Sequence, residues 1–147
     1  MTPQIQNVPA DLMSILSDAN ATQHGKCYEN CVVAVLGTRI SRQLRYVVGF
    51  LTPPDHPPFP HAWLEQEMHG GPIYLDPTLQ ASSALWNSRK NIFMYSARYS
   101  FNKDELLKWF RVKYAGREFN ELGLPVGDIQ GPVLNSKGEL EPVRISV

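Results

Sequence analysis

Apolar residues recur at helical intervals in three stretches of this sequence, which predicts three helices. The first stretch is Ala10 to Ala19, and the last follows Asn102, where Asn102 and Glu105 form a variant of the capping box. The middle stretch, Cys27 to Leu36, has the period of a helix, although three valines in four positions also suit a strand. Gly37 is a reasonable stop for this segment.

Other segments are rich in β-branched and aromatic residues, which is typical of strands. Four strands are predicted on this basis, with the second and third joined around His69-Gly70-Gly71: Arg45 to Leu51, His61 to Glu67, Pro72 to Leu75, and Ile92 to Tyr99.

Residues 1–9 and about 124–147 lack a clear period, and we expect both ends to be loosely structured. The stretch from Thr52 to Pro60 contains five prolines, so it is expected to be neither a helix nor a central strand. We expect it to run over the surface next to His61, either as a wall that narrows a cleft or as a simple spacer.

Composition narrows the possible functions. The 147 residues suffice for one domain with its own core, and the 14 basic and 14 acidic side chains cancel. A chain with no net charge has no long-range field that would attract nucleic acid or an anionic membrane, so neither partner is expected. No apolar run approaches the roughly 20 residues of a membrane span, and the first residues lack the pattern of a signal peptide. We therefore expect a cytoplasmic protein.

A thiol, an imidazole and a carboxylate follow one another in the chain as Cys27, His61 and Asp76. In a nucleophilic site of this type the acid orients the base and the base activates the thiol. Cys27 lies where the middle helix should begin, and the positive end of a helix dipole favours a thiolate. Cys31 lies a turn further along, and we assign it to the core. No metal or cofactor is needed for this chemistry.

The two strands around the glycines predict a register. If the loop is Glu67 to Gly70, Gln66 pairs with Gly71 and His61 falls directly opposite Asp76. Facing Cβ atoms lie about 5 Å apart, within reach of an imidazole–carboxylate hydrogen bond. A strict two-residue Gly70-Gly71 turn would instead place Glu65 opposite Asp76 and take His61 out of range.

The same site needs donors for an oxyanion. One would be the backbone N–H of Cys27. For the second, Gln23 is the best candidate, with His24 or another backbone amide as alternatives. Trp63 shares a strand face with His61, because alternate residues point the same way. It is interpreted as a core residue, a wall of the cleft beside the base, or both.

Four short motifs resemble the core of the transglutaminase-like superfamily, which belongs with the papain-like cysteine peptidases. They are Gly25-Lys26-Cys27, Tyr46-Val47-Val48-Gly49, His61-Ala62-Trp63-Leu64-Glu65 and Leu75-Asp76-Pro77-Thr78. The resemblance implies an α+β fold in which a central helix carrying Cys27 packs on an antiparallel sheet carrying His61 and Asp76. It also implies acyl transfer through a thioester, as a peptidase, deamidase or transglutaminase acting on a peptide or protein.

Two other functions are compatible with the sequence. The chain could keep such a fold without activity and bind a protein partner through its proline-rich loop and C-terminal arm. A third hypothesis is a binding module stabilised by zinc held by Cys27, Cys31, His24 and His61, although a C-x-x-x-C spacing is unusual for zinc.

Overall fold

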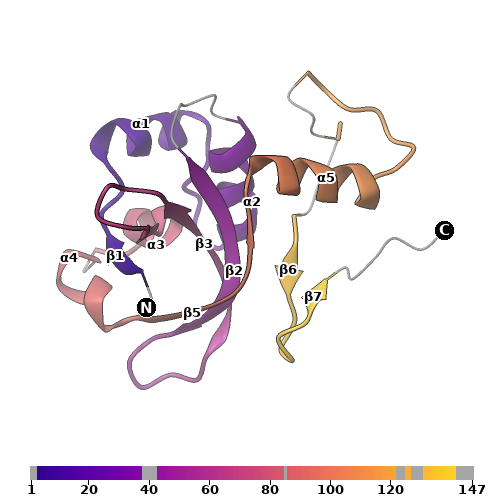
Figure 1. The fold of residues 1–147 in the computed structure, drawn as a ribbon. Helices are drawn as coiled ribbons and strands as arrows, with labels where there is room; N and C mark the ends of the chain where they lie inside the picture. Colours follow the sequence, from indigo (N-terminus) through magenta and orange to yellow (C-terminus); the bar gives the residue numbers. More distant parts are fainter. Residues whose placement is uncertain (1–2, 38–42, 85, 122–124, 127–130, 142–147) are drawn as a thin grey trace.

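A computed structural model describes residues 3–37, 43–84, 86–121, 125–126 and 131–141, which form an α+β fold around one five-stranded sheet (Figure 1). The α+β class implied by the resemblance is thus confirmed. The elements in chain order are β1 (Gln4–Gln6), α1 (Ala10–Asp18), α2 (Cys27–Val32), the π-helical η1 (Val33–Gly37), β2 (Leu44–Thr52), β3 (Phe59–Gln66), β4 (Ile73–Leu75), α3 (Pro77–Ser82), α4 (Trp86–Arg89), the 3₁₀ turn η2 (Lys90–Ile92), β5 (Met94–Phe101), α5 (Lys103–Lys113), β6 (Val133–Leu134) and β7 (Leu140–Glu141).

The sheet is mixed rather than purely antiparallel. Its strand order is β1-β4-β3-β2-β5, and every neighbouring pair is antiparallel except β1 with β4, which is parallel. The expectation of an antiparallel sheet was wrong at this edge, because β1 belongs to the N-terminal segment for which no strand was predicted. A three-residue strand is too short for its alternation to be recognised in sequence.

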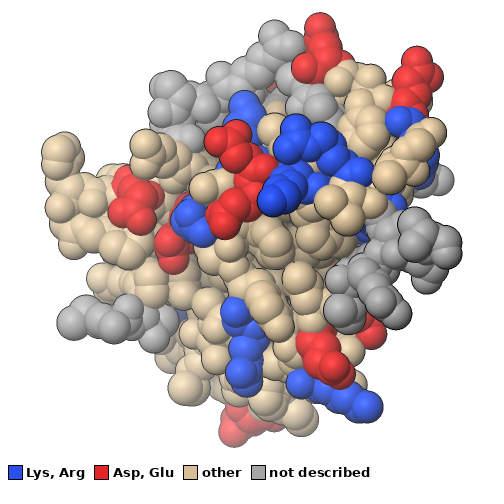
Figure 2. Space-filling view, turned by 45° about the vertical axis from the view of Figure 1, so that its right-hand side comes forward, with Lys and Arg blue, Asp and Glu red and all other residues tan. Residues whose placement is uncertain are grey.

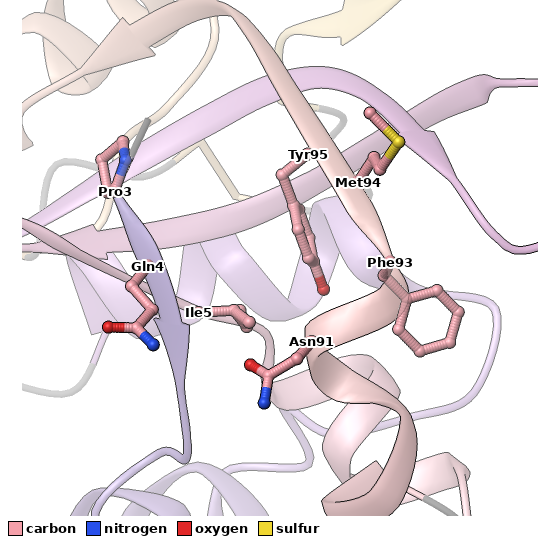
Figure 3. A pocket seen from close by; sticks show the side chains of 7 residues that line it. All are labelled: Pro3, Gln4, Ile5, Asn91, Phe93, Met94 and Tyr95. Atoms are coloured by element: carbon pink, nitrogen blue, oxygen red, sulfur yellow. The ribbon is translucent and has the colours of Figure 1, made fainter. Parts of the chain in front are cut away.

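The two outer strands approach each other in space. Residues of both β1 and β5 line one pocket of about 450 Å³, together with Asn91 of η2 and Phe93 directly after it (Figure 3). The sheet is therefore curved, so that its two edges lie on either side of this pocket. A cluster of buried side chains packs inside the curve, with three partly buried aromatic or aliphatic neighbours: Ile5, Val47, Leu51, Trp63, Tyr74, Trp86 and Tyr95, with Phe59, Leu79 and Phe93 against them.

A second and larger cluster joins α1, α2 and α5 to the sheet. Neighbouring residues of β3 divide between the two clusters, because successive side chains of a strand point to opposite faces. Ala62 and Leu64 belong to the larger cluster, and Trp63 belongs to the smaller one. β3 is thus buried on both sides, which fixes the direction of each of its side chains.

The middle helix is confirmed, since α2 begins at Cys27 and continues into η1. A turn leads into it, with the Lys26 N–H donating to the Gln23 carbonyl at 3.2 Å. Gly25 has a φ of 77° in this turn, a conformation that side chains disfavour. The predicted capping box at the start of α5 is also confirmed, with both hydrogen bonds between Asn102 and Glu105 present.

Gly49 permits a close contact between β2 and β5. It pairs with His61 across β2 and β3, and the register with β5 shifts between Val48 and Gly49. A Cβ at this position would lie 2.1 Å from the Ser96 carbonyl oxygen and 2.8 Å from the Trp63 ring. Only glycine therefore allows β5 and Trp63 to pack as they do here.

The proline-rich stretch divides between a loop and a strand. Residues 53–58 connect β2 to β3 and are mostly exposed, as expected. Pro60, however, lies within β3 and pairs with Phe50 of β2. The prediction that the stretch from Thr52 to Pro60 is neither a helix nor a central strand was wrong at its ends, because Thr52 belongs to β2 and both Phe59 and Pro60 belong to β3. A proline normally interrupts the pairing of a strand inside a sheet. Pro60 is tolerated because β4 pairs only with Leu64 to Gln66, so β3 has one neighbouring strand at Pro60.

The described part of the C-terminal arm contains a short hairpin, where no regular structure was expected. β6 pairs with β7, and the Tyr46 hydroxyl donates to the Pro132 carbonyl at 2.6 Å. Leu134 is buried, and Tyr28 forms a hydrogen bond with its backbone. Tertiary contacts of this kind order a segment that has little periodicity of its own. Residues 1–2, 124, 127–130 and 142–147, which the same expectation included, lie outside the described residues.

The surface carries charges of both signs. On the face shown in Figure 2, Lys and Arg side chains lie next to Asp and Glu side chains. The helix α5 contributes to this mixture, with Asp104 and Glu105 in its first turn and Arg111 and Lys113 in its last. Among the described helices, none combines the length and the apolar character required to cross a bilayer.

Candidate active site

Cys27 is the first residue of α2 and is half-buried. The first N–H groups of a helix have no partner within it, and they carry the positive end of the helix dipole. The thiol therefore lies at the end of the helix toward which the backbone N–H groups point. This is the position that the sequence predicted for a nucleophile.

Asp76 lies between β4 and α3 and is completely buried. One carboxylate oxygen, Oδ1, accepts the Leu79 N–H at 3.1 Å and so caps α3, while Pro77 occupies the first turn. No helix was predicted after the strand that was expected to end at Leu75. The cap holds the carboxylate in one orientation.

His61 connects the other two groups. Its Nε2 lies 2.8 Å from Oδ2 of Asp76, and Cys27 lies close enough to the imidazole to raise its pKa. Because Nε2 faces the carboxylate, Nδ1 is the nitrogen left for the thiol. The imidazole is 4% exposed, so water competes little for either contact. The three predicted residues thus come together in the order thiol, imidazole, carboxylate.

The electrostatic environment favours a protonated imidazole. Burial alone would lower the pKa of His61, but the charge of Asp76, the hydrogen bonds with Asp76 and Cys27, and the charge of Cys27 together raise it to about 10. An imidazolium in turn favours a thiolate on a neighbouring cysteine. The arrangement therefore suits a thiolate–imidazolium pair.

The strand register differs from the predicted one. Gln66 pairs with Ile73 rather than with Gly71, so the loop is two residues longer than expected. Continuing this register by one step places Asp76 opposite Trp63 and diagonal to His61. The shift is even, so the two side chains keep the same face, and a diagonal separation of about 7–8 Å is still within reach of an imidazole and a carboxylate.

Trp63 packs directly on the base. Its ring is stacked on His61, with centroids 6.2 Å apart and planes at 23°, and it is fully buried. Its edge contacts with Tyr74 and Tyr95 add to the support. The interpretation as a core residue is confirmed, whereas a contact with substrate stays a prediction.

Gln23 lies on the surface, where its Nε2 donates to the Asn20 carbonyl at 3.2 Å. This position does not support an oxyanion role for its side chain, and that assignment stays a prediction. The neighbouring alternative, His24, is also exposed.

Tyr95, which was not predicted as a site residue, is a further partner of Asp76. Its hydroxyl donates to Oδ2 at 2.8 Å, and Figure 3 shows the ring directed from β5 into the molecule. Burial, followed by the charge of Asp76, raises the pKa of Tyr95 well above its usual range, so it remains a neutral donor. A tyrosine in a strand is ordinary, and nothing in the sequence pointed to this contact.

Cys31 is completely buried, and burial raises the pKa of its thiol well above the usual range. Its assignment to the core is confirmed. The described residues contain no group of three or more His, Cys, Asp or Glu side chains arranged to hold a metal ion.

The chain matches no family model, and no curated protein or solved structure matches it. The site must therefore be interpreted from its own geometry.

Proposed function

We propose that this chain is a cysteine-dependent amide hydrolase or acyltransferase with a papain-like or transglutaminase-like arrangement of its site. The observation that carries the proposal is the position of the buried His61 between two predicted partners: its Nε2 lies 2.8 Å from Oδ2 of Asp76, and both Asp76 and Cys27 raise its pKa. That arrangement supplies a nucleophile, a general acid and base, and a group that fixes the tautomer.

The proposed reaction proceeds in two steps. The Cys27 thiolate attacks the carbonyl carbon of an amide, and the imidazolium of His61 gives its proton to the leaving nitrogen, so that a thioester forms and an amine departs. Water or a second amine then attacks the thioester, transfers a proton to His61 and releases an acid or a new amide. The thiolate and the imidazolium are restored.

The protein partner of this reaction is its substrate, a peptide or protein that presents an amide. Backbone N–H groups at the start of α2 are suited to stabilise the oxyanion that develops in both steps. Peptide hydrolysis, deamidation and transamidation share these steps and differ in the leaving group and the acceptor.

The test is selective thiol chemistry. Iodoacetamide should label Cys27 well below pH 8 and leave Cys31 unmodified, because Cys31 is buried and its pKa is raised. p-Nitrophenyl acetate, an activated acyl donor, should acetylate the same residue, as peptide mass spectrometry would show.

The variants His61→Gln and Cys27→Ser serve as controls. Both should remain folded, the first with slow labelling and the second with none at this position. Equal labelling of the wild type and His61→Gln would contradict the proposal and would favour the alternative of an inactive protein that binds a partner.

A further inference from the structure

Asn30 is a buried polar side chain that the proposed reaction does not use. It lies in α2, one turn after Cys27, and is 2% exposed. A buried amide has three or four hydrogen-bonding positions to satisfy, and leaving them unpaired is costly. Its partners therefore indicate why it is there.

Asn30 holds both backbone groups of Gln23. Its Oδ1 accepts the Gln23 N–H at 3.3 Å, and its Nδ2 donates to the Gln23 carbonyl at 2.9 Å. Because the Gln23 carbonyl can only accept a hydrogen bond, the group that faces it must be the NH₂ of Asn30, and this fixes the orientation of the side-chain amide. The side chain thereby binds both backbone groups of one residue, which belong to two successive peptide units.

Gln23 opens the turn that leads to the nucleophile. Its carbonyl also accepts the Lys26 N–H, and the Asn30 N–H donates to the Lys26 carbonyl at 2.9 Å. The residues between Gln23 and Cys27 are exposed and have few other constraints. The position of the Cys27 backbone therefore depends on how firmly Asn30 holds this turn.

The second hydrogen of Nδ2 binds α3. It is donated to Oγ1 of Thr78 at 2.8 Å, and Thr78 is itself buried. Asp76 is the N-cap of the same helix, two residues earlier. One amide thus joins the turn before the thiol, the helix that carries the thiol, and the helix that the carboxylate caps.

We propose that Asn30 is a positioning residue that fixes the geometry of Cys27 relative to His61 and Asp76 by holding the Gln23 turn and Thr78 together. This inference rests on the proposed function. A displacement of about 1 Å between reacting groups can cost about a hundredfold in rate, so a network that sets this distance affects turnover without touching the substrate.

The first variant is Asn30→Asp, which keeps the size and one acceptor but removes both donors. Iodoacetamide labelling of Cys27 as a function of pH should shift its midpoint upward by about one unit, and acetylation by p-nitrophenyl acetate should slow about tenfold, with KM little changed. Circular dichroism and the melting temperature report whether the variant folds.

A matched pair at position 78 keeps the inference testable if Asn30→Asp does not fold. Thr78→Val removes the hydroxyl and keeps the shape, whereas Thr78→Ser keeps the hydroxyl. The valine variant should slow acetylation severalfold relative to the serine variant, and the serine variant should retain the wild-type midpoint. If both variants lower only the melting temperature and leave the midpoint and the rate unchanged, the network is structural and the inference is overturned.

His61→Gln in the same assays separates the two proposals. If it leaves the labelling profile of Cys27 unchanged, the proposed function fails. If it changes the profile while the changes at Asn30 and Thr78 do not, the function stands and only the role of Asn30 is lost.

Discussion

The Tyr95 hydroxyl donates to Oδ2 of Asp76 at 2.8 Å, the same oxygen that lies 2.8 Å from His61 Nε2. The other oxygen accepts the Leu79 N–H. The fully buried carboxylate therefore has three donors, and each of them opposes its rotation. Because Asp76 is held in one orientation, the His61 imidazole is held as well, and Asp76 determines which of its nitrogens faces the thiol.

Tyr95→Phe should weaken the site while leaving its groups in place. The loss of one hydrogen bond to a charged group is worth about 1.5–3 kcal/mol, and we expect turnover to fall about tenfold and the melting temperature to decrease. Steady-state acetylation and thermal unfolding measure the two effects. Tyr99→Phe on the same strand is the control, because Tyr99 is 41% exposed, and it should change neither quantity. Identical turnover for the two variants would show that Tyr95 has no part in orienting Asp76.

Asp76→Asn should lower turnover far more than it lowers stability. The oxygen of an asparagine can still accept the Leu79 N–H, so the cap on α3 can persist. Its amide nitrogen, however, is a donor where His61 and Tyr95 need an acceptor, and it favours the wrong imidazole tautomer. By analogy with serine triads the loss should reach about 10⁴-fold in turnover.

Acetylation kinetics and the melting temperature should be measured for Asp76→Asn. The control is Asp76→Ala, which loses the cap on α3 as well as the carboxylate. The alanine variant should be less stable than the asparagine variant by about 1 kcal/mol. If Asp76→Asn showed wild-type kinetics, the role of Asp76 would be limited to capping α3.

The parts of the site that the sequence predicted are those carried by local pattern. Cys27 follows a glycine turn and opens an apolar helical stretch, and His61 lies in a clear strand. Their order along the chain predicted the chemistry. The same local patterns predicted α2, β2 and the start of α5.

The rest depends on contacts between distant residues, which no local pattern records. Tyr95 reaches Asp76 only because the sheet curves, and β1 exists only because it pairs with β4. The loop between β3 and β4 is two residues longer than the turn residues suggested, so the register was wrong even though the face was right. The resemblance to a known superfamily, for its part, stays a prediction.

The stability of the protein should depend on pH through His61. Its pKa is raised from 6.5 to about 10 in the folded state by Asp76 and Cys27, which outweigh the opposing effect of burial. A group whose pKa is raised on folding stabilises the folded protein fully at pH values below its unfolded pKa, which is near 6.5 for His61. This contribution to the free energy of unfolding is lost as the pH rises through the folded-state pKa of about 10. The difference in melting temperature between the wild type and His61→Gln should therefore shrink between these two limits.

His56→Gln is the control for this measurement. His56 is exposed, and its Nδ1 lies 2.7 Å from the Pro57 carbonyl. The melting temperature of this variant, measured over the same pH range, shows what the loss of an exposed imidazole alone does. A difference between wild type and His61→Gln that does not vary with pH would mean that the imidazole holds no additional proton in the folded state.

The last prediction concerns residues 53–58, the loop between β2 and β3. A chain of ring contacts connects it to the base: His56 packs edge-on against Phe59 at 5.8 Å, and Phe59 packs edge-on against His61 at 6.0 Å. The prolines restrict the loop, so little entropy is lost when it is held in one place. These contacts favour a wall beside the imidazole over a simple spacer.

Replacing Pro54, Asp55, His56 and Pro57 by Gly and Ser should therefore raise KM severalfold for a peptide substrate, because a more mobile wall must be ordered when substrate binds. Labelling of Cys27 by iodoacetamide should not change, since this small reagent needs no wall. The control is Met68→Ser, which should not change KM. Met68 is exposed and lies in a turn in which the Gly71 N–H donates to the Met68 carbonyl. If the loop replacement lowers the melting temperature and leaves KM unchanged, the loop is a spacer.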